Sequence, residues 1–89
     1  MKILKIWAVW CSGCLVMWPL FKEIEKENPW LETSYYEYDD SPEIVEKYGL
    51  DWDVPYFIFL DKEGNILEKI NWEFSKKEIM TRIEKYKDK

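Results

Sequence analysis

Two runs of strand-forming residues flank a helical pattern in the first half of the chain, and this order constrains the fold most strongly. The mostly apolar residues Ile3 to Val9 predict a buried strand. From Ser12 to Asn28, apolar residues recur at steps of three and four, which predicts an amphipathic helix kinked at Pro19. Thr33 to Tyr38 predicts a second strand. Because strand–helix–strand crossovers are right-handed, we expect these two strands to lie parallel in one sheet.

The middle of the chain predicts a short helix followed by two strands. Ser41 and Pro42 have the residue types of an N-cap and a first helical position, and Gly49 ends this helix. Tyr56 to Leu60 and Ile66 to Ile70 predict strands joined by a tight hairpin whose loop contains a glycine. This hairpin should add antiparallel pairing to the sheet.

A terminal helix completes the predicted fold. Ser75 and Glu78 have the spacing of a capping box, and the residues after them form an apolar stripe of Ile79, Ile83 and Tyr86. The predicted class is α/β, with one domain over residues 1–89 in the order β-α-β-α-β-β-α. We expect a mixed four-stranded sheet with helices on both faces.

The composition excludes several classes of function. The net charge of −5 argues against a nucleic-acid partner. The absence of histidine excludes Cys-His and Ser-His-Asp hydrolase sites. The opening apolar stretch is interrupted by Lys5 and reaches no small-residue cleavage site, so we do not read it as a secretion signal. No segment approaches the roughly 20 apolar residues of a membrane span. We therefore expect a cytoplasmic protein without a membrane partner.

Cys11 and Cys14 are the only cysteines, and they stand three residues apart at the start of the predicted helix. This spacing puts both on one helical face with Cα atoms about 5–6 Å apart, within reach of a disulfide. The helix N-terminus favours a thiolate at Cys11, whereas Cys14 should be more buried and less ionised. Cys11 is thus predicted to attack and Cys14 to resolve. Two thiolates are too few for a structural zinc site in one chain, although two chains could share four.

Several segments together resemble the thioredoxin family, and the resemblance covers nearly the whole chain. They are WAVWCSGC at residues 7–14, Pro19, DDSP at 39–42, KYG at 47–49 and Val54-Pro55 before an apolar strand. The resemblance implies the thioredoxin fold, with a cis-proline loop beside the cysteines. It further implies a thiol-disulfide oxidoreductase that reduces or exchanges protein disulfides through a mixed disulfide. A thioredoxin-reductase-like or other thiol donor would supply its electrons, and we expect a monomer without a cofactor.

The resemblance also assigns site residues. Cys11 and Cys14 would be catalytic, and six residues would contact the substrate: Trp10, Ser12, Gly13, Val54, Pro55 and Trp72. The other tryptophans include Trp7, Trp18 and Trp30, which we expect in the core or in packing contacts. Residues 69–73 lack the Gly-Gly that glutaredoxins use to hold glutathione, which favours a protein disulfide over a glutathione adduct.

Three departures from the family pattern stand out. The family's first strand and helix have no counterpart before Ile3, and Ser12-Gly13 replaces the usual Gly-Pro, which is compatible with a somewhat more oxidising pair. Lys5 occupies the position where the family buries an acid. Lys5 could be a pKa modulator that stabilises the Cys14 thiolate. The alternative, which we favour, is that it extends along the sheet with its ammonium in solvent.

Two other functions remain open from the sequence. The first is a redox-responsive protein-binding module without turnover of its own. The second is a metal or cluster bridge between two chains. Turnover in an insulin disulfide-reduction assay separates an oxidoreductase from a binding module, whereas metal content and apparent mass test the bridge.

Overall fold

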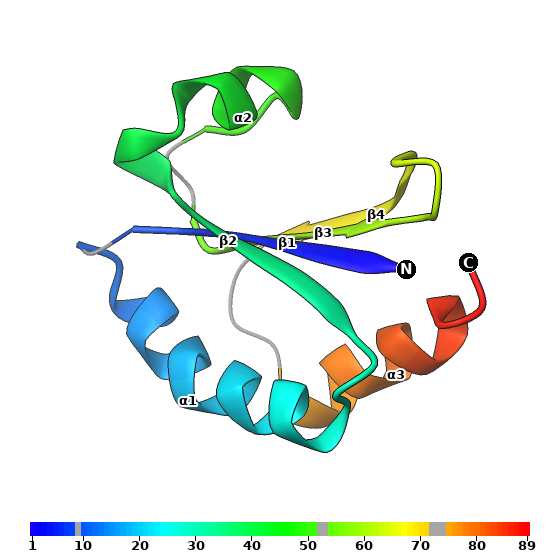
Figure 1. Cartoon of the computed structure of the whole chain (residues 1–89). Coiled ribbons are helices and arrows are strands. Elements are labelled where there is room, and N and C mark those ends of the chain that lie inside the picture. Colours follow the sequence, from blue (N-terminus) through cyan, green and yellow to red (C-terminus); the bar gives the residue numbers. More distant parts are fainter. Residues whose placement is uncertain (9, 52–53, 72–74) are drawn as a thin grey trace.

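The computed structural model describes residues 1–8, 10–51, 54–71 and 75–89, and it contains one mixed sheet with helices on both faces (Figure 1). The four strands are β1 (Lys2–Trp7), β2 (Glu32–Glu37), β3 (Tyr56–Leu60) and β4 (Ile66–Asn71). The helices are α1 (Ser12–Glu27), α2 (Pro42–Lys47) and α3 (Lys76–Tyr86), with a short 3₁₀ helix, η1 (Tyr38–Asp40), before α2. The predicted order of elements and the predicted fold class are confirmed.

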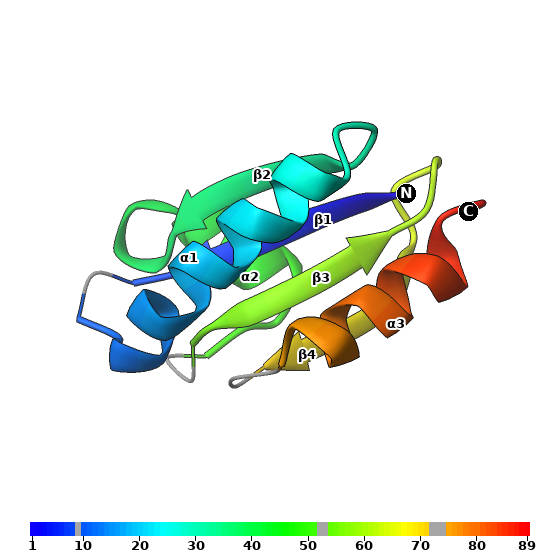
Figure 2. The same ribbon diagram turned by 90° about the horizontal axis from the view of Figure 1, so that it is seen from below.

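The strand order in the sheet is β2-β1-β3-β4. β1 and β2 are parallel, and their register places Lys5 opposite Tyr35 and Trp7 opposite Glu37. β3 runs antiparallel to both of its neighbours, β1 and β4. Figure 2 shows α1 and α3 side by side across one face of this sheet, with α3 on the β4 side. Because β1 and β2 are parallel, their C-terminal ends lie side by side, at the end of the sheet where α1 begins.

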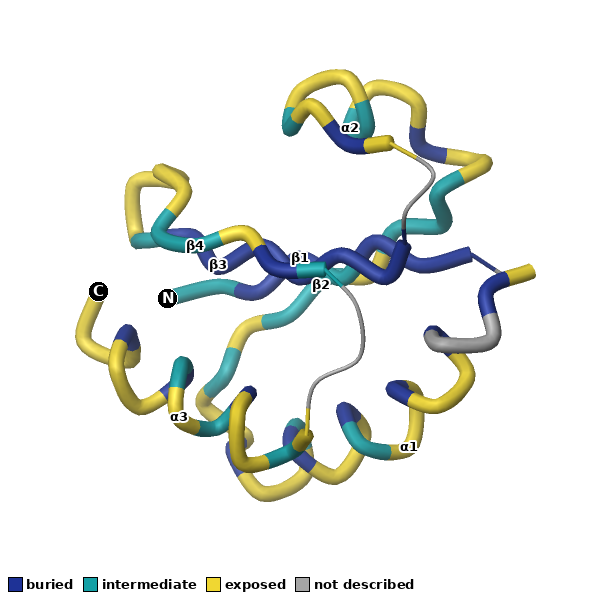
Figure 3. The backbone as a smooth tube through the Cα atoms, turned by 180° about the vertical axis from the view of Figure 1, so that it is seen from behind, coloured by how far each residue is buried: buried dark blue, intermediate teal, exposed yellow. Residues whose placement is uncertain are grey.

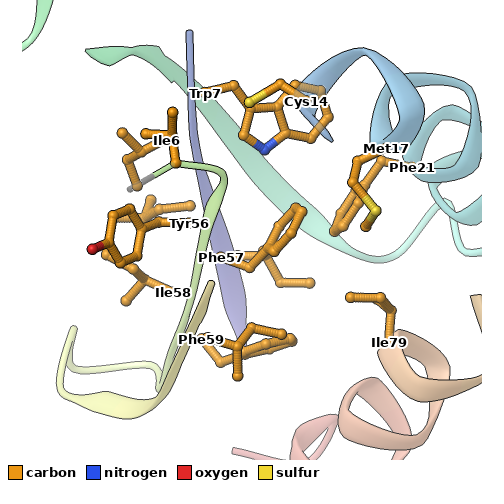
Figure 4. Packing of buried hydrophobic residues seen from close by; sticks show 14 of the residues in the cluster. Ile6, Trp7, Cys14, Met17, Phe21, Tyr56, Phe57, Ile58, Phe59 and Ile79 are labelled. Carbon is orange, nitrogen blue, oxygen red and sulfur yellow. The ribbon is translucent and has the colours of Figure 1, made fainter. Parts of the chain in front are cut away.

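The core lies mainly between the sheet and the pair α1 and α3. All five residues of β3 are buried, and Figure 3 shows buried positions on the sheet and on the helix sides that face it. Phe21 of α1 stacks on Phe57 of β3 with ring centroids 5.0 Å apart and an interplanar angle of 6° (Figure 4). The predicted stripe of α3, Ile79, Ile83 and Tyr86, is buried as well. These contacts fix α1 on the sheet and so fix the cysteines at its first turn.

The ends of the elements follow their local residue types with one exception. Gly49 and Gly64 have positive φ angles of 64° and 86°, as the predicted helix end and hairpin require. Ser75 and Glu78 form the predicted capping box. Ser41 is the N-cap residue of α2 and Pro42 its first residue, as predicted, but the Ser41 side chain makes no capping hydrogen bond. α1 continues through Pro19 from Ser12 to Glu27.

The three tryptophans expected in the core or in packing contacts differ in burial. Trp7 is buried as predicted, but Trp18 and Trp30 are 48% and 51% exposed. Trp18 lies at the rim of the apolar stripe of α1, where it makes packing contacts with Trp7 and Tyr35 at 5.7 Å and 6.0 Å between ring centroids. Trp30 lies in the turn between α1 and β2. A helical period alone does not separate the centre of a stripe from its rim.

Candidate active site

Cys11 is the N-cap residue of α1, directly after the connection from β1. Its backbone φ and ψ are −94° and 112°, and its N–H donates to the carbonyl of Ala8 at 3.1 Å. The backbone N–H of Cys14 donates to the Cys11 sulfur at 3.1 Å, where a capping side chain normally accepts. This N–H and the helix dipole both favour negative charge on the Cys11 sulfur. The predicted position of Cys11 at the helix N-terminus is confirmed.

Cys14 lies one turn into α1 and faces the core. Its exposed fraction is 3%, against 7% for Cys11. Burial raises the pKa of the Cys14 thiol to about 12, and its hydrogen bond to Cys11 and the negative charges of Cys11 and Glu37 add to this rise. The backbone at Ala8 opposes it in part. Both cysteines are free thiols, and Cys14 is the more buried of the two, as predicted.

The Val54-Pro55 loop closes the site from the side of β3. Its peptide bond is cis, as the resemblance implies. The thiol of Cys11 donates to the carbonyl oxygen of Val54 at 3.5 Å, and both loop residues are buried. The structure therefore brings together three predicted site residues, Cys11, Val54 and Pro55, from segments 43 residues apart.

Trp10 precedes Cys11 and is 53% exposed. Its indole N–H donates to the carboxylate of Asp39 at 2.9 Å, and its ring meets Tyr38 edge-on at 6.3 Å. These two contacts hold the indole against η1, directly after β2, and leave about half of the Trp10 side chain exposed. Asp39 was not among the predicted site residues, although it is the first residue of the DDSP segment that the resemblance singles out.

The remaining predicted substrate contacts lie at the start of α1 and beyond β4. Ser12 and Gly13 are the first two residues of α1, between the cysteines. Trp72 lies outside the described residues, so its assignment stays a prediction.

The position of Lys5 shows that the interpretation we favoured, with its ammonium in solvent, was wrong. Its ammonium is not in solvent but donates to the carboxylate of Glu25 on α1 at 2.7 Å, with the two side chains 12% and 24% exposed. It also lies 5.7 Å and 5.5 Å from the ring centroids of Trp7 and Phe21. Thr33 donates a second hydrogen bond to Glu25, at 2.9 Å. An effect of Lys5 on Cys14 stays a hypothesis, and the ammonium on which it depends is paired with Glu25.

Glu37 on β2 also acts on Cys14, and Tyr35 on the same strand holds Glu37. The sequence did not predict either residue as part of the site. The Tyr35 hydroxyl donates to the Glu37 carboxylate at 3.0 Å. Burial raises the pKa of Tyr35 to about 12, helped by the hydrogen bond to Glu37 and by the charges of Glu37 and Cys14. The parallel pairing of β1 and β2 was predicted, but its register was not, and the register is what puts Glu37 beside Trp7.

Within the described residues, no group of three or more His, Cys, Asp or Glu side chains is arranged to hold a metal ion. The helices in the same part of the chain lack the length and apolar character needed to cross a membrane.

Comparison with known proteins places these features in a family. A family model described as Thioredoxin matches residues 1–86. The thioredoxin of Listeria monocytogenes is 30% identical over 81 residues, which are 90% of this chain and 77% of that protein. The thioredoxin of Rickettsia bellii is 35% identical over 49 residues, and this chain spans only 47% of its length.

Solved structures agree on the fold. The crystal structure of a Nicotiana alata thioredoxin has a TM-score of 0.86 at 21% identity, covering 96% of this chain and 71% of that one. The Fasciola hepatica thioredoxin also has a TM-score of 0.86, at 22% identity, covering 96% and 79%. With the family match over nearly its full length and this common fold, the chain belongs to the thioredoxin family.

Proposed function

We propose that this protein is a thiol-disulfide oxidoreductase that reduces or exchanges protein disulfides. The observation that carries the proposal is the asymmetry of the two thiols. Cys11 caps α1 and accepts the N–H of Cys14, whereas Cys14 is more buried and has a pKa of about 12. One sulfur is thus arranged to ionise and attack, and the other to keep its proton until the second step.

The reaction has two exchange steps. The Cys11 thiolate attacks one sulfur of the substrate disulfide, so a Cys11–substrate bond forms and the substrate's second sulfur leaves as a thiolate. Cys14 then loses its proton and attacks the Cys11 sulfur, which breaks the mixed disulfide and releases the second substrate thiol. The substrate gains two electrons, and the Cys11–Cys14 pair is oxidised. A thiol donor, of the thioredoxin-reductase type or another dithiol, returns the pair to the reduced state.

Substrate docking is proposed to use the open surface around Cys11. Trp10 offers an exposed indole fixed by Asp39, and the Val54-Pro55 loop lies against the thiol from the other side. An extended segment carrying the disulfide could lie between them with its backbone along this loop. Such a surface suits a protein substrate better than a small thiol adduct.

Reduction of insulin disulfides, followed by turbidity with dithiothreitol as donor, tests the proposal. We expect wild type to accelerate precipitation, Cys11→Ser to be inactive, and Cys14→Ser to accumulate a mixed disulfide visible by mass spectrometry. If wild type does not exceed the dithiothreitol background, the oxidoreductase proposal is wrong. Binding of a partner to only one oxidation state would then favour the redox-responsive binding module.

A further inference from the structure

Lys5 occupies the position where the family resemblance leads us to expect a buried acid beneath the cysteines. An acidic side chain nevertheless reaches this region from another strand. Tyr35 and Glu37 are two residues apart on β2, so their side chains lie on the same face of the sheet. Tyr35 contacts Trp18 of α1, which identifies this face as the one that α1 covers. Glu37 is therefore on the cysteine side of the sheet, at the end of β2 nearest the first turn of α1.

The register places Glu37 opposite Trp7, which is a neighbour of the resolving cysteine. Glu37 pairs with Trp7, and Figure 4 shows Trp7 beside Cys14 in the core. The Tyr35 hydroxyl donates to the Glu37 carboxylate at 3.0 Å, and the Tyr35 ring meets Trp7 edge-on at 5.7 Å. The carboxylate is thus held by a tyrosine that is 43% exposed and lies at the rim of the core, with its ring against Trp7 and Trp18.

We propose that Glu37, held by Tyr35, is a positioning residue whose charge favours the protonated form of Cys14 and so slows the resolving step. This inference rests on the proposed oxidoreductase function and names a residue that acts on its second step. A fixed negative charge near a thiol disfavours the thiolate. The electrostatic influence runs both ways between β2 and α1, because the charge of Glu37 adds to the raised pKa of Cys14 and the charge of Cys14 adds to that of Tyr35, each as the last of several causes.

The other ionisable groups around Cys14 have different partners in the described residues. Cys11, on the same helix turn, is the second thiol of the site. Lys5 of β1 is paired with Glu25 of α1. The ammonium of Lys22, also on α1, lies over the Trp18 ring at 5.3 Å. The ionisable groups that β2 contributes to this region are Glu37 and Tyr35.

The test compares Glu37→Gln with Glu32→Gln in the full chain. Both variants remove one carboxylate from β2, but Glu32 is exposed at the opposite end of the strand, about 16 Å away at the usual rise per residue. The pKa of Cys14 is read from its Cβ resonance during a pH titration of the reduced protein. We expect Glu37→Gln to lower this pKa and Glu32→Gln to leave it unchanged.

A kinetic measurement reports on the same charge. When reduced protein attacks Ellman's reagent, Cys11 forms a mixed disulfide and releases one thionitrobenzoate. Cys14 then attacks the Cys11 sulfur, giving up its proton to solvent and releasing the second thionitrobenzoate. When the pKa of Cys14 falls by one unit, its thiolate fraction rises tenfold but the thiolate becomes a weaker nucleophile. The rate of its attack on the Cys11 sulfur therefore rises by about threefold. We therefore expect the second release to be faster in Glu37→Gln near neutral pH, by about threefold for each unit by which the Cys14 pKa falls.

Tyr35→Phe supplies an independent variant, because it removes the hydrogen bond that holds the carboxylate but keeps the charge. We expect a smaller fall in the Cys14 pKa than in Glu37→Gln. An unchanged Cys14 pKa in Glu37→Gln, or an equal shift in Glu32→Gln, would overturn the inference. Neither measurement needs a protein substrate, so failure of the insulin assay would contradict the proposed function without affecting this result.

Discussion

Replacing Lys5 by methionine should destabilise the protein by leaving a carboxylate unpaired beneath α1. The ammonium of Lys5 lies 2.7 Å from the Glu25 carboxylate. Methionine keeps most of the apolar stem that packs between Trp7 and Phe21 but removes the charge. Glu25 would then retain only the Thr33 hydroxyl among the two partners that the structure gives it.

The magnitude follows from how far the pair is buried. Breaking a fully buried pair by removing one partner costs about 3–5 kcal/mol, whereas an exposed pair contributes about 0–1 kcal/mol. The side chains of Lys5 and Glu25 are 12% and 24% exposed, which places this pair between the two limits. We expect Lys5→Met to lower the free energy of unfolding by about 2 kcal/mol, or the melting temperature by about 10 °C.

Urea denaturation at two pH values checks both the size and the cause. Burial raises the pKa of Glu25, but hydrogen bonds from Lys5 and Thr33 outweigh it, so the net shift is downward. A carboxyl whose folded pKa is depressed stabilises the fold above its unfolded pKa, and this stabilisation is lost as pH falls through the folded value. The cost of Lys5→Met should therefore be full at pH 7 and should shrink in acid, where Glu25 is protonated.

The double variant Lys5→Met/Glu25→Gln separates the pair from other effects. Removing both charges should recover part of the stability lost in Lys5→Met, because no unpaired charge then remains beneath the helix. Equal stability of Lys5→Met and wild type at pH 7, or a loss that is as large in acid, would refute the reasoning. If the Cys14 pKa also changes in Lys5→Met, the lysine acts on the cysteine as well as on Glu25.

Other predictions concern the surface, the thiols and the terminal helix. Asp39→Asn weakens the hydrogen bond that fixes Trp10, so we expect KM for insulin to rise about three- to tenfold with kcat little changed. Iodoacetamide near pH 8 should modify Cys11 and spare Cys14, whose pKa is about 12, as peptide mass spectrometry would show; equal labelling of both would contradict the assignment of roles. Ser75→Ala removes a capping box and should lower stability by about 1 kcal/mol in urea denaturation, without loss of activity.

Local patterns were enough to predict the elements and the positions of the two thiols. The period of α1, the glycines at positive φ and the capping box each depend on residues close together in the chain, so the sequence carries them directly. Pairs distant in the chain were not predictable in this way. Lys5 and Glu25 are 20 residues apart, and Trp10 and Asp39 are 29 apart. Their contacts depend on how α1 and β2 are seated on β1.

The exposed tryptophans show that prediction from the sequence is limited for side-chain packing as well. Trp18 follows the helical period of α1, yet its ring is half exposed because the centre of the stripe is already filled by Met17 and Phe21. Hydrophobicity and spacing predict which face turns inward. They do not predict where on that face the available space ends, since this depends on the side chains of the sheet below.

The register of β1 and β2 explains how an acidic side chain can lie on the cysteine side of the sheet although position 5 is a lysine. Parallel partners point to the same face, so Lys5 lies beside Tyr35, and Trp7 lies beside Glu37. A charged side chain on β2 therefore lies in the same layer beneath α1 as the β1 side chain with which it pairs. Lys5 takes its counter-charge from Glu25 of the helix, and the carboxylate of Glu37, two residues after Tyr35 on β2, adds to the raised pKa of Cys14. The acid that influences Cys14 then comes from the edge strand, and substitutions on β2 should alter the resolving step more than substitutions of Lys5.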